Sequence, residues 1–563
     1  MTSQQASFVG DHKSIRWLSA VCLALAVVCV ALLACTPPFD RDGLIHHLQI
    51  PKLYLQHGSI YEIPDLVFSY YPMNLDMLYM GALWLGSDIL PKYIHMAFAF
   101  ATALLLFFHL KKRIASTYAW LGAVFFLSVP VIVKLSVTVY VDLGLVFFST
   151  AALLLLFRWL ETKRWQHLLL AGFCGGLGIG TKYNGLLVLF ILTFMVPVLW
   201  IRSQVLHQRA AGPAVKAAVL FCLAALLAAS PWLIRNAVWT GNPIYPLYNG
   251  FFNRAAASAE DTATSDGEAQ GGGVRGVFAT RHVLYGENIW QLILLPVRIF
   301  FHEAQDDDPR YFDGRLNPFL LILPILALLR SIRQANKQTQ LEQIALAAFC
   351  LLYFLFAFNT GVLRIRYLVP MVPFLVILSM YGLYHIEMLT PKHVAKQSIA
   401  LAIWLLPITL MLIWNGHYLY GQFKKISPLS YISGRLSRDE YLAKQLPEYQ
   451  VMQYANKHLP ASAKILCIFM GWRGYYLEKP HSFDSHGNPN GLIALLNKPG
   501  TTAEQIGQWL KEKGFNYLLI RRDLLYNQLR SEDINAQQLW VELEQKHLLP
   551  LSSNQEYTLY QAF

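Results

Sequence analysis

The sequence predicts an α-helical polytopic membrane protein with about eleven transmembrane helices, outer-face juxtamembrane helices and a small C-terminal α/β soluble domain. Of its 563 residues, 55% are hydrophobic and only 14% are charged, and the mean hydropathy is +0.38. That composition is more apolar than a soluble protein allows. Apolar runs of about 20 residues, each long enough to cross roughly 30 Å of hydrocarbon, recur along the chain. The composition becomes polar only near residue 415.

The length criterion places each predicted span on one apolar run. We predict spanning helices at residues 15–36, 91–110, 115–134, 139–158, 167–181, 184–201, 214–234, 316–331, 342–358, 366–388 and 397–415. The first of these runs continues too long for a cleaved signal peptide, so we expect it to remain as a helix. Six of the seven cysteines lie in apolar runs, and there is no CxxC pattern. This spacing predicts neither a disulfide framework nor a cysteine metal site.

The positions of the basic residues predict on which side of the membrane each loop lies. The net charge of +12 comes largely from Lys and Arg in short loops between apolar runs, which argues against a nucleic-acid partner. Five basic clusters fall on the same side as the N-terminus, at residues 111–113, 163–164, 202–216, 330–337 and 392–396. The positive-inside rule therefore predicts a cytoplasmic N-terminus and an extracytoplasmic C-terminal domain.

Two loops and the tail then lie on the outer side. We predict a transmembrane domain at 1–415, with a first outer loop at 37–90 and a long outer loop at 235–315, and an extracytoplasmic α/β domain at 416–563. Residues 72–86 would span only about 22 Å at ~1.5 Å per residue, which is too short to cross. We therefore predict an amphipathic helix in the membrane interface there, with Asn74 and Asp76 facing away from lipid.

The tail reads as a compact strand, helix and strand unit. Buried strands are predicted at 463–469 and 516–520, and a helix at 501–514. Thr501 and Glu504 have the spacing of a capping box, and Gly514 follows as a stop. The unit contains no nucleophile elbow, P-loop or metal quartet, so we expect it to cover a membrane-embedded site or to bind an acceptor.

Three carboxylates reach the outer side of the membrane. Asp40 and Asp42 follow the first predicted helix, where an ordinary helix-exit cap is the simplest interpretation. Asp142 lies near the outer start of the fourth predicted helix, and a carboxylate at the edge of hydrocarbon indicates either function or a buried partner. Lys134 is the candidate partner in a purely structural pair.

Three cations are predicted on the same side. Lys182 follows a glycine-rich helix whose small side chains would let helices approach closely, and snorkelling to head groups is its alternative role. Arg364 and Arg366 carry two guanidinium groups two residues apart, which suit a phosphate. Acids can accept a proton from a hydroxyl while cations hold a departing phosphate. The pattern therefore favours lipid-phosphate-dependent transfer to an alcohol.

At this point the chain resembles the GT-C membrane glycosyltransferases of the protein-mannosyltransferase and aminoarabinose-transferase group, in the bacterial branch that uses polyprenyl-phosphate sugars. The resemblance runs from about residue 40 to residue 373. Its carriers are Asp42–Leu48, Pro51–Tyr54, Tyr71-Pro72, Asp142, Thr181–Tyr183, Pro231-Trp232, Arg235-Asn236, Thr240–Pro243 and Arg364–Tyr367 with Pro370.

The resemblance implies a GT-C-like fold, a role for each matching residue, and a place in the bacterial inner membrane. An acid in the first outer loop would be the catalytic base. Asp40 and Asp42 are both candidates, and Asp42 is favoured by its position. Asp142 would be the second membrane-edge acid and Lys182 the phosphate-side lysine. The implied substrate-binding residues are Lys182, Tyr183, Arg364, Arg366, Tyr71 and Arg235.

The same resemblance implies the substrates and the course of the reaction. The donor would be a polyprenyl-phosphate sugar, and the acceptor an envelope glycan, lipid or protein. A single displacement would invert the anomeric centre. Some relatives bind a divalent metal through a Glu and a His, but His46, His47 and Glu62 give no clear equivalent, so no cofactor is expected.

Two other functions share some of these features. A ligase or polymerase acting on a lipid-linked oligosaccharide would have the same topology and charges. A secondary transporter would place charges near the bilayer midplane and show an inverted repeat. The sequence shows no internal repeat, and its charges gather at one face, which favours the transferase.

Overall fold

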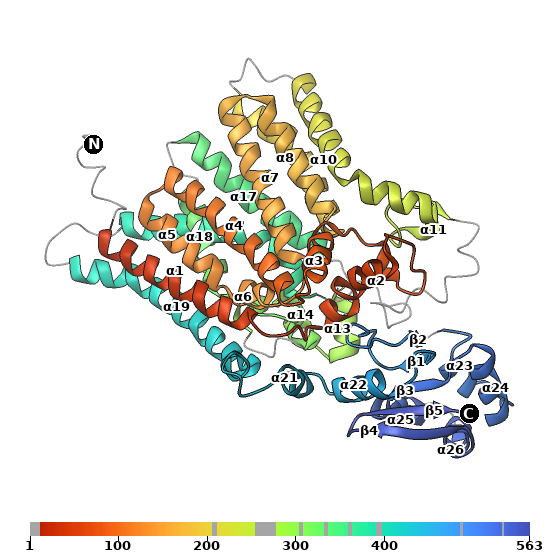
Figure 1. Ribbon diagram of the computed structural model, residues 1–563. Helices are drawn as coiled ribbons and strands as arrows, with labels where there is room; N and C mark the ends of the chain where they lie inside the picture. Colours follow the sequence, from red (N-terminus) through yellow and green to blue (C-terminus); the bar gives the residue numbers. More distant parts are fainter. Residues whose placement is uncertain are drawn as a thin grey trace.

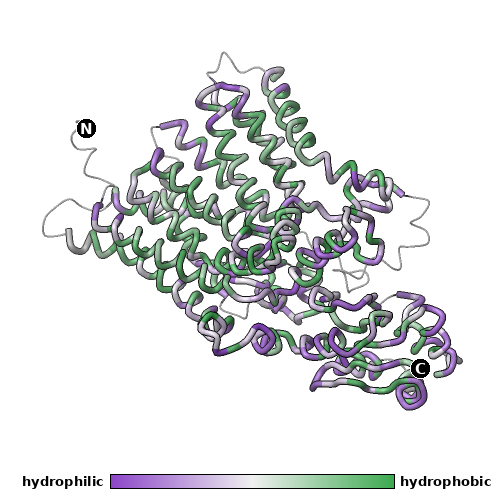
Figure 2. Tube along the Cα trace, in the orientation of Figure 1, coloured by the Kyte–Doolittle hydropathy of each residue, from purple (hydrophilic) through white to green (hydrophobic). Residues whose placement is uncertain are grey.

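The computed structural model consists of a helical bundle and a smaller C-terminal α/β part (Figure 1). It describes residues 12–204, 211–253, 277–302, 308–331, 336–358, 363–389, 397–484, 488–531 and 534–563. Most residues along the bundle helices are hydrophobic, whereas polar residues predominate on the C-terminal part (Figure 2). This contrast agrees with a multi-pass membrane protein that carries a soluble domain.

Eight helices in the described residues are long and apolar enough to cross a membrane. They are α1 (Lys13–Ala34), α4 (Leu90–Arg113), α7 (Asp142–Thr162), α9 (Asn184–Ser203), α10 (Ala211–Thr240), α17 (Lys337–Phe358), η6 (Ile365–Met371) continuing into α18 (Val372–Leu389), and α19 (Gln397–Ile426). A ninth span exists if α5 (Ser116–Ser128) and α6 (Pro130–Ser136) cross together, although they bend by 63°. Proline opens α6, and the residue before a proline disfavours helix, which explains the break.

Within the described residues, fewer than the eleven predicted helices are therefore long enough to cross a membrane by this criterion. The predicted spans at 167–181 and 316–331 correspond to α8 (Trp165–Ile179) and α16 (Phe319–Ser331), which have only 15 and 13 residues. Close packing against α10 explains the glycines of α8. A Cβ on Gly172 or Gly176 of α8 would lie 2.3 or 2.1 Å from a carbonyl oxygen of α10. The predicted close approach of the glycine-rich helix is therefore present.

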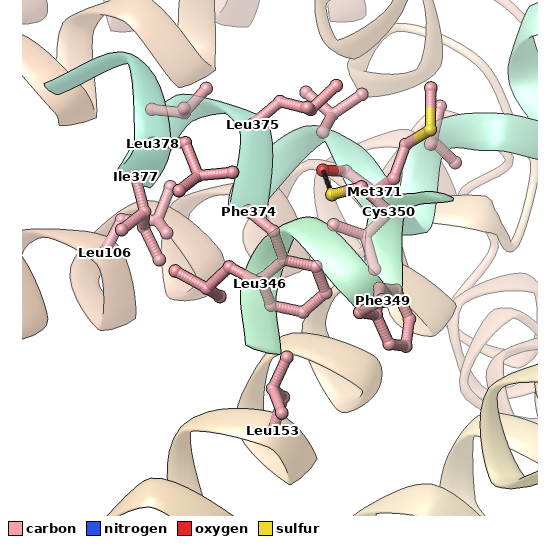
Figure 3. Close-up of a cluster of buried hydrophobic side chains, with 14 of the residues drawn as sticks. Leu106, Leu153, Leu346, Phe349, Cys350, Met371, Phe374, Leu375, Ile377 and Leu378 are labelled. Carbon is pink, nitrogen blue, oxygen red and sulfur yellow. Dashed lines mark hydrogen bonds between the residues drawn. The ribbon is translucent and has the colours of Figure 1, made fainter. Parts of the chain in front are cut away.

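The centre of the bundle is a continuous apolar core. Figure 3 shows Leu346, Phe349 and Cys350 of α17 against Phe374 and neighbouring residues of α18. The rings of Phe349 and Phe374 meet edge to face with centroids 4.8 Å apart. Leu106 of α4 and Leu153 of α7 complete this region. These contacts fix η6, which lies at the N-terminal end of α18, relative to α7.

Short helices build the outer end of the bundle. The first outer loop folds into a π-helix, η1 (Gly43–His47), followed by α2 (Gln49–His57), η2 (Val67–Tyr70) and α3 (Asn74–Trp84). The predicted helix at 72–86 is therefore present as α3. Its Asp76 is buried, and Asn74 contacts the α8 and α10 helices through Leu177 and Trp232. The long outer loop contains α11 (Asn249–Phe252), α13 (Val277–Tyr285), α14 (Ile289–Ile293), α15 (Leu295–Phe301) and η5 (Pro309–Tyr311).

The C-terminal part contains a five-stranded mixed sheet in the order β2-β1-β3-β5-β4. The strands are β1 (Ile465–Ile468), β2 (His481–Asp484), β3 (Tyr517–Arg521), β4 (Leu548–Ser553) and β5 (Tyr557–Ala562), and β1 runs parallel to β2 and β3. Its helices are α20 (Pro428–Ile432), α21 (Arg438–Gln445), α22 (Tyr449–His458), α23 (Leu492–Leu496), α24 (Ala503–Glu512), α25 (Arg522–Ser531) and α26 (Ile534–His547). Alternate residues of β1 and β3 enter two separate apolar clusters, so both faces of the sheet are covered.

Two predictions about this part change in detail. The helix near 501–514 is α24, but its capping box is formed by Thr502 and Gln505 instead of Thr501 and Glu504. The last bundle helix, α19, continues to Ile426, beyond the predicted boundary at 415/416. The division into two domains therefore stays a prediction.

The C-terminal part packs directly on the first outer loop. Leu44 shares a buried apolar cluster with Leu442, Leu446 and Tyr449. Lys52 Nζ donates to the backbone oxygen of Tyr475 at 2.7 Å, and the Tyr476 hydroxyl donates to that of Pro38 at 2.7 Å. The loop at 37–57 and the segment at 438–477 thus form one packed unit.

Candidate active site

A cavity of about 330 Å³ opens at the end of the bundle that the basic loops predict to be the outer one. It lies between the first outer loop, α6, η6, the end of α19 and the C-terminal part. Three carboxylates and six basic side chains line it, so its wall carries a surplus of positive charge. The carboxylates are Asp40, Asp42 and Asp313, and the basic residues are Arg41, Lys134, Arg364, Arg366, Lys425 and Arg473. A positive wall suits an anionic ligand.

Asp42 and Arg366 form an ion pair on this wall. The Nη1 of Arg366 donates to Oδ2 of Asp42, although 324 positions separate them in the sequence. Burial alone would raise the pKa of Asp42, but the guanidinium of Arg366 outweighs it and holds that pKa well below the ordinary 3.8. Asp42 is therefore a carboxylate at neutral pH, and its side chain is 21% exposed to the cavity.

Asp40 has a different environment. Its carboxylate accepts the backbone N–H of Gly43 at 3.1 Å and that of Val139 at 3.2 Å. A Cβ at position 43 would lie 2.3 Å from Asp40 Oδ2, so glycine is required for this close contact. Burial raises the pKa of Asp40, and the charge of Lys92 partly opposes that rise. These contacts tie the first outer loop to the start of α7.

Lys182 and Arg366 lie on one aromatic ring. Lys182 Nζ and Arg366 Cζ are each 5.2 Å from the centroid of Tyr367, so they are no more than about 10.4 Å apart. Arg364 Cζ is 5.9 Å from the same centroid. The predicted convergence of Lys182 with the two arginines is thus present around Tyr367.

Asp142 is paired with Lys182, not with Lys134. Lys182 Nζ donates to Asp142 Oδ1 at 2.7 Å, and the carboxyl side chain is only 3% exposed. The predicted Lys134 partner is wrong because Lys134 Nζ instead donates to Asp313 at 3.0 Å. Both ends of the Asp142 pair are carried by helix termini that the packing of α7, α8 and α9 brings together.

Asp313 is a site residue that the sequence did not reveal. It lies in the left-handed region, at φ 48°, just before Gly314. Its carboxylate reaches Lys134 at 3.0 Å, Arg366 at 3.8 Å and Arg364 at 4.0 Å. It therefore holds three cations of the cavity together. In the sequence, the signal for it is an Asp-Gly pair shortly before an apolar run.

The other predicted substrate residues form a neighbouring cluster outside the cavity. The Tyr183 hydroxyl donates to the backbone oxygen of Tyr245 at 2.7 Å. Arg235 is held between Trp232 and Trp239, and it donates to the backbone oxygen of Tyr71 at 3.0 Å. These contacts organise the polypeptide beside Lys182. The structure thus separates Tyr183, Tyr71 and Arg235 from the residues that line the cavity.

The two adjacent histidines have different environments. His47 contacts Asp76 at 2.7 Å between Nδ1 and Oδ1, and both residues are buried. His46 stacks on Phe68 with centroids 4.6 Å apart. Burial, followed by the charge of His47, holds the pKa of His46 well below 6.5, so it is neutral near pH 7. No group of three or more His, Cys, Asp and Glu side chains within the described ranges has metal-binding geometry.

The C-terminal part supplies one side of the cavity. Gln445, Leu446 and Arg473 line it, and Arg473 Nε is 3.0 Å from Oε1 of the buried Glu448. This agrees with the expectation that the tail covers a membrane-embedded site. Arg473 was not singled out in the sequence because it lies 431 positions after Asp42.

Comparisons with known proteins agree with this arrangement. Residues 85–234 match the family model of dolichyl-phosphate-mannose-protein mannosyltransferases, a segment that contains Asp142 and Lys182. The structure is similar to ArnT from Cupriavidus metallidurans bound to undecaprenyl phosphate, with a TM-score of 0.58, 12% sequence identity and 97% of each chain covered. This chain has the GT-C fold. The resemblance found in the sequence is confirmed at that level.

The same fold extends to a larger enzyme. The apo oligosaccharyltransferase from Archaeoglobus fulgidus superposes with a TM-score of 0.51 and 11% identity, over 97% of this chain and 74% of that one. A search of curated protein sequences found no match. Together, the family match and the GT-C fold support a membrane glycosyltransferase.

Proposed function

We propose that this GT-C protein transfers a sugar from a polyprenyl-phosphate donor to a hydroxyl of a cell-envelope acceptor. One observation carries the proposal. Asp42, Arg364 and Arg366 line one positively charged cavity, and Lys182 and Arg366 both contact the ring of Tyr367. A solute channel needs no such combination of a carboxylate and phosphate-binding cations. The ArnT of similar fold binds undecaprenyl phosphate, which is the kind of lipid proposed here as the leaving group.

Asp42 is proposed as the general base. The acceptor O–H proton passes to its carboxylate while the acceptor oxygen forms a bond to the anomeric carbon of the sugar. The bond from that carbon to the phosphate oxygen breaks, and its electron pair leaves with the lipid phosphate. One displacement of this kind inverts the anomeric centre. General-base catalysis contributes about 10²–10⁴ in rate.

The cations are proposed to bind the donor phosphate. Arg364 and Arg366 offer guanidinium donors, and Lys182 adds an ammonium held in place by Asp142. Such preorganised charges stabilise the developing negative charge on a leaving phosphate. Tyr183, Tyr71 and Arg235 are proposed to shape the neighbouring wall. Asp40 is the alternative base, but its contacts with the backbone at Gly43 and Val139 suit a loop-positioning role better.

The proposed reaction needs no cofactor, and we propose none. The acceptor is an envelope lipid, glycan or protein, and the C-terminal part is placed to contact it because Arg473 and Gln445 line the cavity. We place the protein in the bacterial inner membrane, with a cytoplasmic N-terminus and a periplasmic C-terminal domain, on the distribution of basic loops.

The test is transfer of a labelled sugar from polyprenyl phosphate by the purified protein in detergent. Asp42→Asn should reduce the transfer rate by about 10²–10⁴-fold, because it removes the base while keeping the side-chain shape. Circular dichroism and gel filtration would check that the variant stays folded. Full activity of Asp42→Asn would move the base to Asp40 or Asp142. Uptake of solute into vesicles with no sugar transfer would favour a transporter instead.

A further inference from the structure

The proposed base, Asp42, and a proposed phosphate-binding group, Arg366, are hydrogen-bonded to each other. Asp42 Oδ2 accepts a hydrogen bond from Arg366 Nη1. A carboxylate oxygen that accepts from a guanidinium is a weaker base toward an incoming hydroxyl. A guanidinium that donates to a carboxylate has fewer N–H groups for a phosphate. The hydrogen bond therefore joins two groups that the proposed reaction needs for different substrates.

Arg366 is well fixed but incompletely hydrogen-bonded. Its side chain is only 8% exposed, and its guanidinium lies 5.2 Å from the ring centroids of both Tyr140 and Tyr367. Its buried Nε has no hydrogen-bond partner among the described residues, and Asp313 Oδ2 is 3.8 Å away. The aromatic rings fix the guanidinium position, so a phosphate that enters the cavity would meet a preformed donor group.

Asp42 is more exposed than Arg366. Its side chain is 21% exposed to the cavity, against 8% for Arg366, and it is the N-cap residue of the π-helix η1. The second acid of the site behaves differently: Asp142 is 3% exposed and does not line the cavity. Of these two ion pairs, only the one between Asp42 and Arg366 has both partners among the residues that line the cavity.

We propose that the ion pair of Asp42 and Arg366 is a resting contact that the donor phosphate displaces, so that Asp42 becomes available to the acceptor hydroxyl only after the donor is bound. The inference rests on the proposed function. The donor is a phosphodiester with one negative charge, like a carboxylate, so the displacement depends on the surplus of cations: Arg364 lines the cavity beside Arg366, and Lys182 lies against the same Tyr367 ring. The consequence is an ordered reaction in which the donor binds first.

The geometry predicts that Asp42 opposes binding of the lipid phosphate. Binding of undecaprenyl phosphate, without a sugar, to the full-length protein in detergent measures this directly. Asp42→Asn should bind it at least about fivefold more tightly than the unmodified protein, because Arg366 no longer has a charged competitor. Asp40→Asn is the matched control: it alters a carboxyl in the same loop and cavity that makes no contact with Arg366, and its affinity should change less than twofold.

Each outcome of this experiment decides something. Equal or weaker binding by Asp42→Asn, with normal binding by the unmodified protein, overturns the displacement but leaves the proposed function standing. Equal tightening by Asp42→Asn and Asp40→Asn reduces the effect to general electrostatics and also overturns it. An absence of binding in all three proteins overturns both the inference and the proposed donor.

Kinetics give a second test, which does not depend on the folding of Asp42→Asn. An acceptor analogue that lacks the reacting hydroxyl should inhibit the unmodified protein uncompetitively with respect to the donor, because it would bind only after the donor. Competitive or mixed inhibition would show that the acceptor site forms without the donor, which contradicts the proposed displacement.

Discussion

Two clusters of buried charge lie at opposite ends of the same helices. At the outer ends of α4 and α7 are Asp42, Arg366, Lys182 and Asp142. At the far ends, Arg113 of α4 donates to Glu161 of α7 and to Glu342 of α17. Both clusters contain well-buried ion pairs, and Asp42 and Arg366 of the outer one line a cavity that has more basic than acidic side chains. We therefore expect a ligand-accessible surplus of one sign, and not buried charge alone, to mark the functional site.

The far cluster should be structural, and it gives the largest expected effect. Arg113→Met leaves Glu161 and Glu342 without their shared cation, and breaking a buried pair by removing one partner costs about 3–5 kcal/mol. We expect a clear fall in the melting temperature in detergent with transfer activity per folded molecule unchanged. Lys112→Met is the control, since that lysine is 48% exposed and should matter little. A loss of activity with an unchanged melting temperature would contradict the structural role expected for the far cluster.

Lys182 should matter for chemistry as well as for folding. Lys182→Met removes a cation from the proposed phosphate site and should lower kcat/KM about a hundredfold. It also leaves the buried Asp142 unpaired, which destabilises the protein. The double variant Lys182→Met with Asp142→Asn should recover the melting temperature but not the activity. Recovery of both would assign Lys182 to the structural class of the far cluster.

The pH dependence should reveal the charge beside the base. Asp42 must be ionised to act, and Arg366 holds its pKa below 3.8, so kcat/KM should show no acid limb from Asp42 between about pH 5 and 8. In Arg366→Gln, burial is no longer opposed by the guanidinium and the pKa rises. An acid limb should then move into the measured range, with activity falling as the pH falls. An unchanged profile would mean that Asp42 is not the titrating base.

The smallest effect is expected at the mouth of the cavity. Arg41 is exposed and lines the cavity, so Arg41→Gln should raise the donor KM only about threefold, through weaker electrostatic attraction. The difference from the unmodified protein should shrink in high salt, because salt screens exposed charges. A salt-independent loss would instead indicate a direct contact with substrate.

Much of the outer cluster could be predicted from the sequence, because the sidedness of apolar runs decides which end of a helix a charge occupies. Asp42, Lys182, Arg364 and Arg366 were placed on one side by this argument, and they do converge. The pairing within the cluster could not be predicted. Lys134 lies closer to Asp142 in the sequence than Lys182 does, yet the crossing of α7 with α8 and α9 brings Lys182 to the carboxylate. Asp313 and Arg473 depend on long-range folding in the same way.

The other differences have local physical causes. The predicted spans at 167–181 and 316–331 are already shorter than the roughly 20 residues of a full crossing, and α8 and α16 have 15 and 13 residues. Near α24, two overlapping Thr-x-x-Glu/Gln patterns compete for the capping position. Thr502 has the extended backbone of an N-cap residue, and starting the helix there buries Ala503, Ile506 and Leu510, which selects it over Thr501. Burial therefore decided between two motifs of equal local quality.

The apolar cluster of Leu44 with Leu442, Leu446 and Tyr449 also has a consequence for biosynthesis. The loop that carries Asp42 is among the first segments to leave the ribosome, whereas its packing partners belong to the last quarter of the 563-residue chain. The loop can reach its final shape only when translation is almost finished. A chain that stops before residue 442 would therefore lack this packing of the loop that carries Asp42.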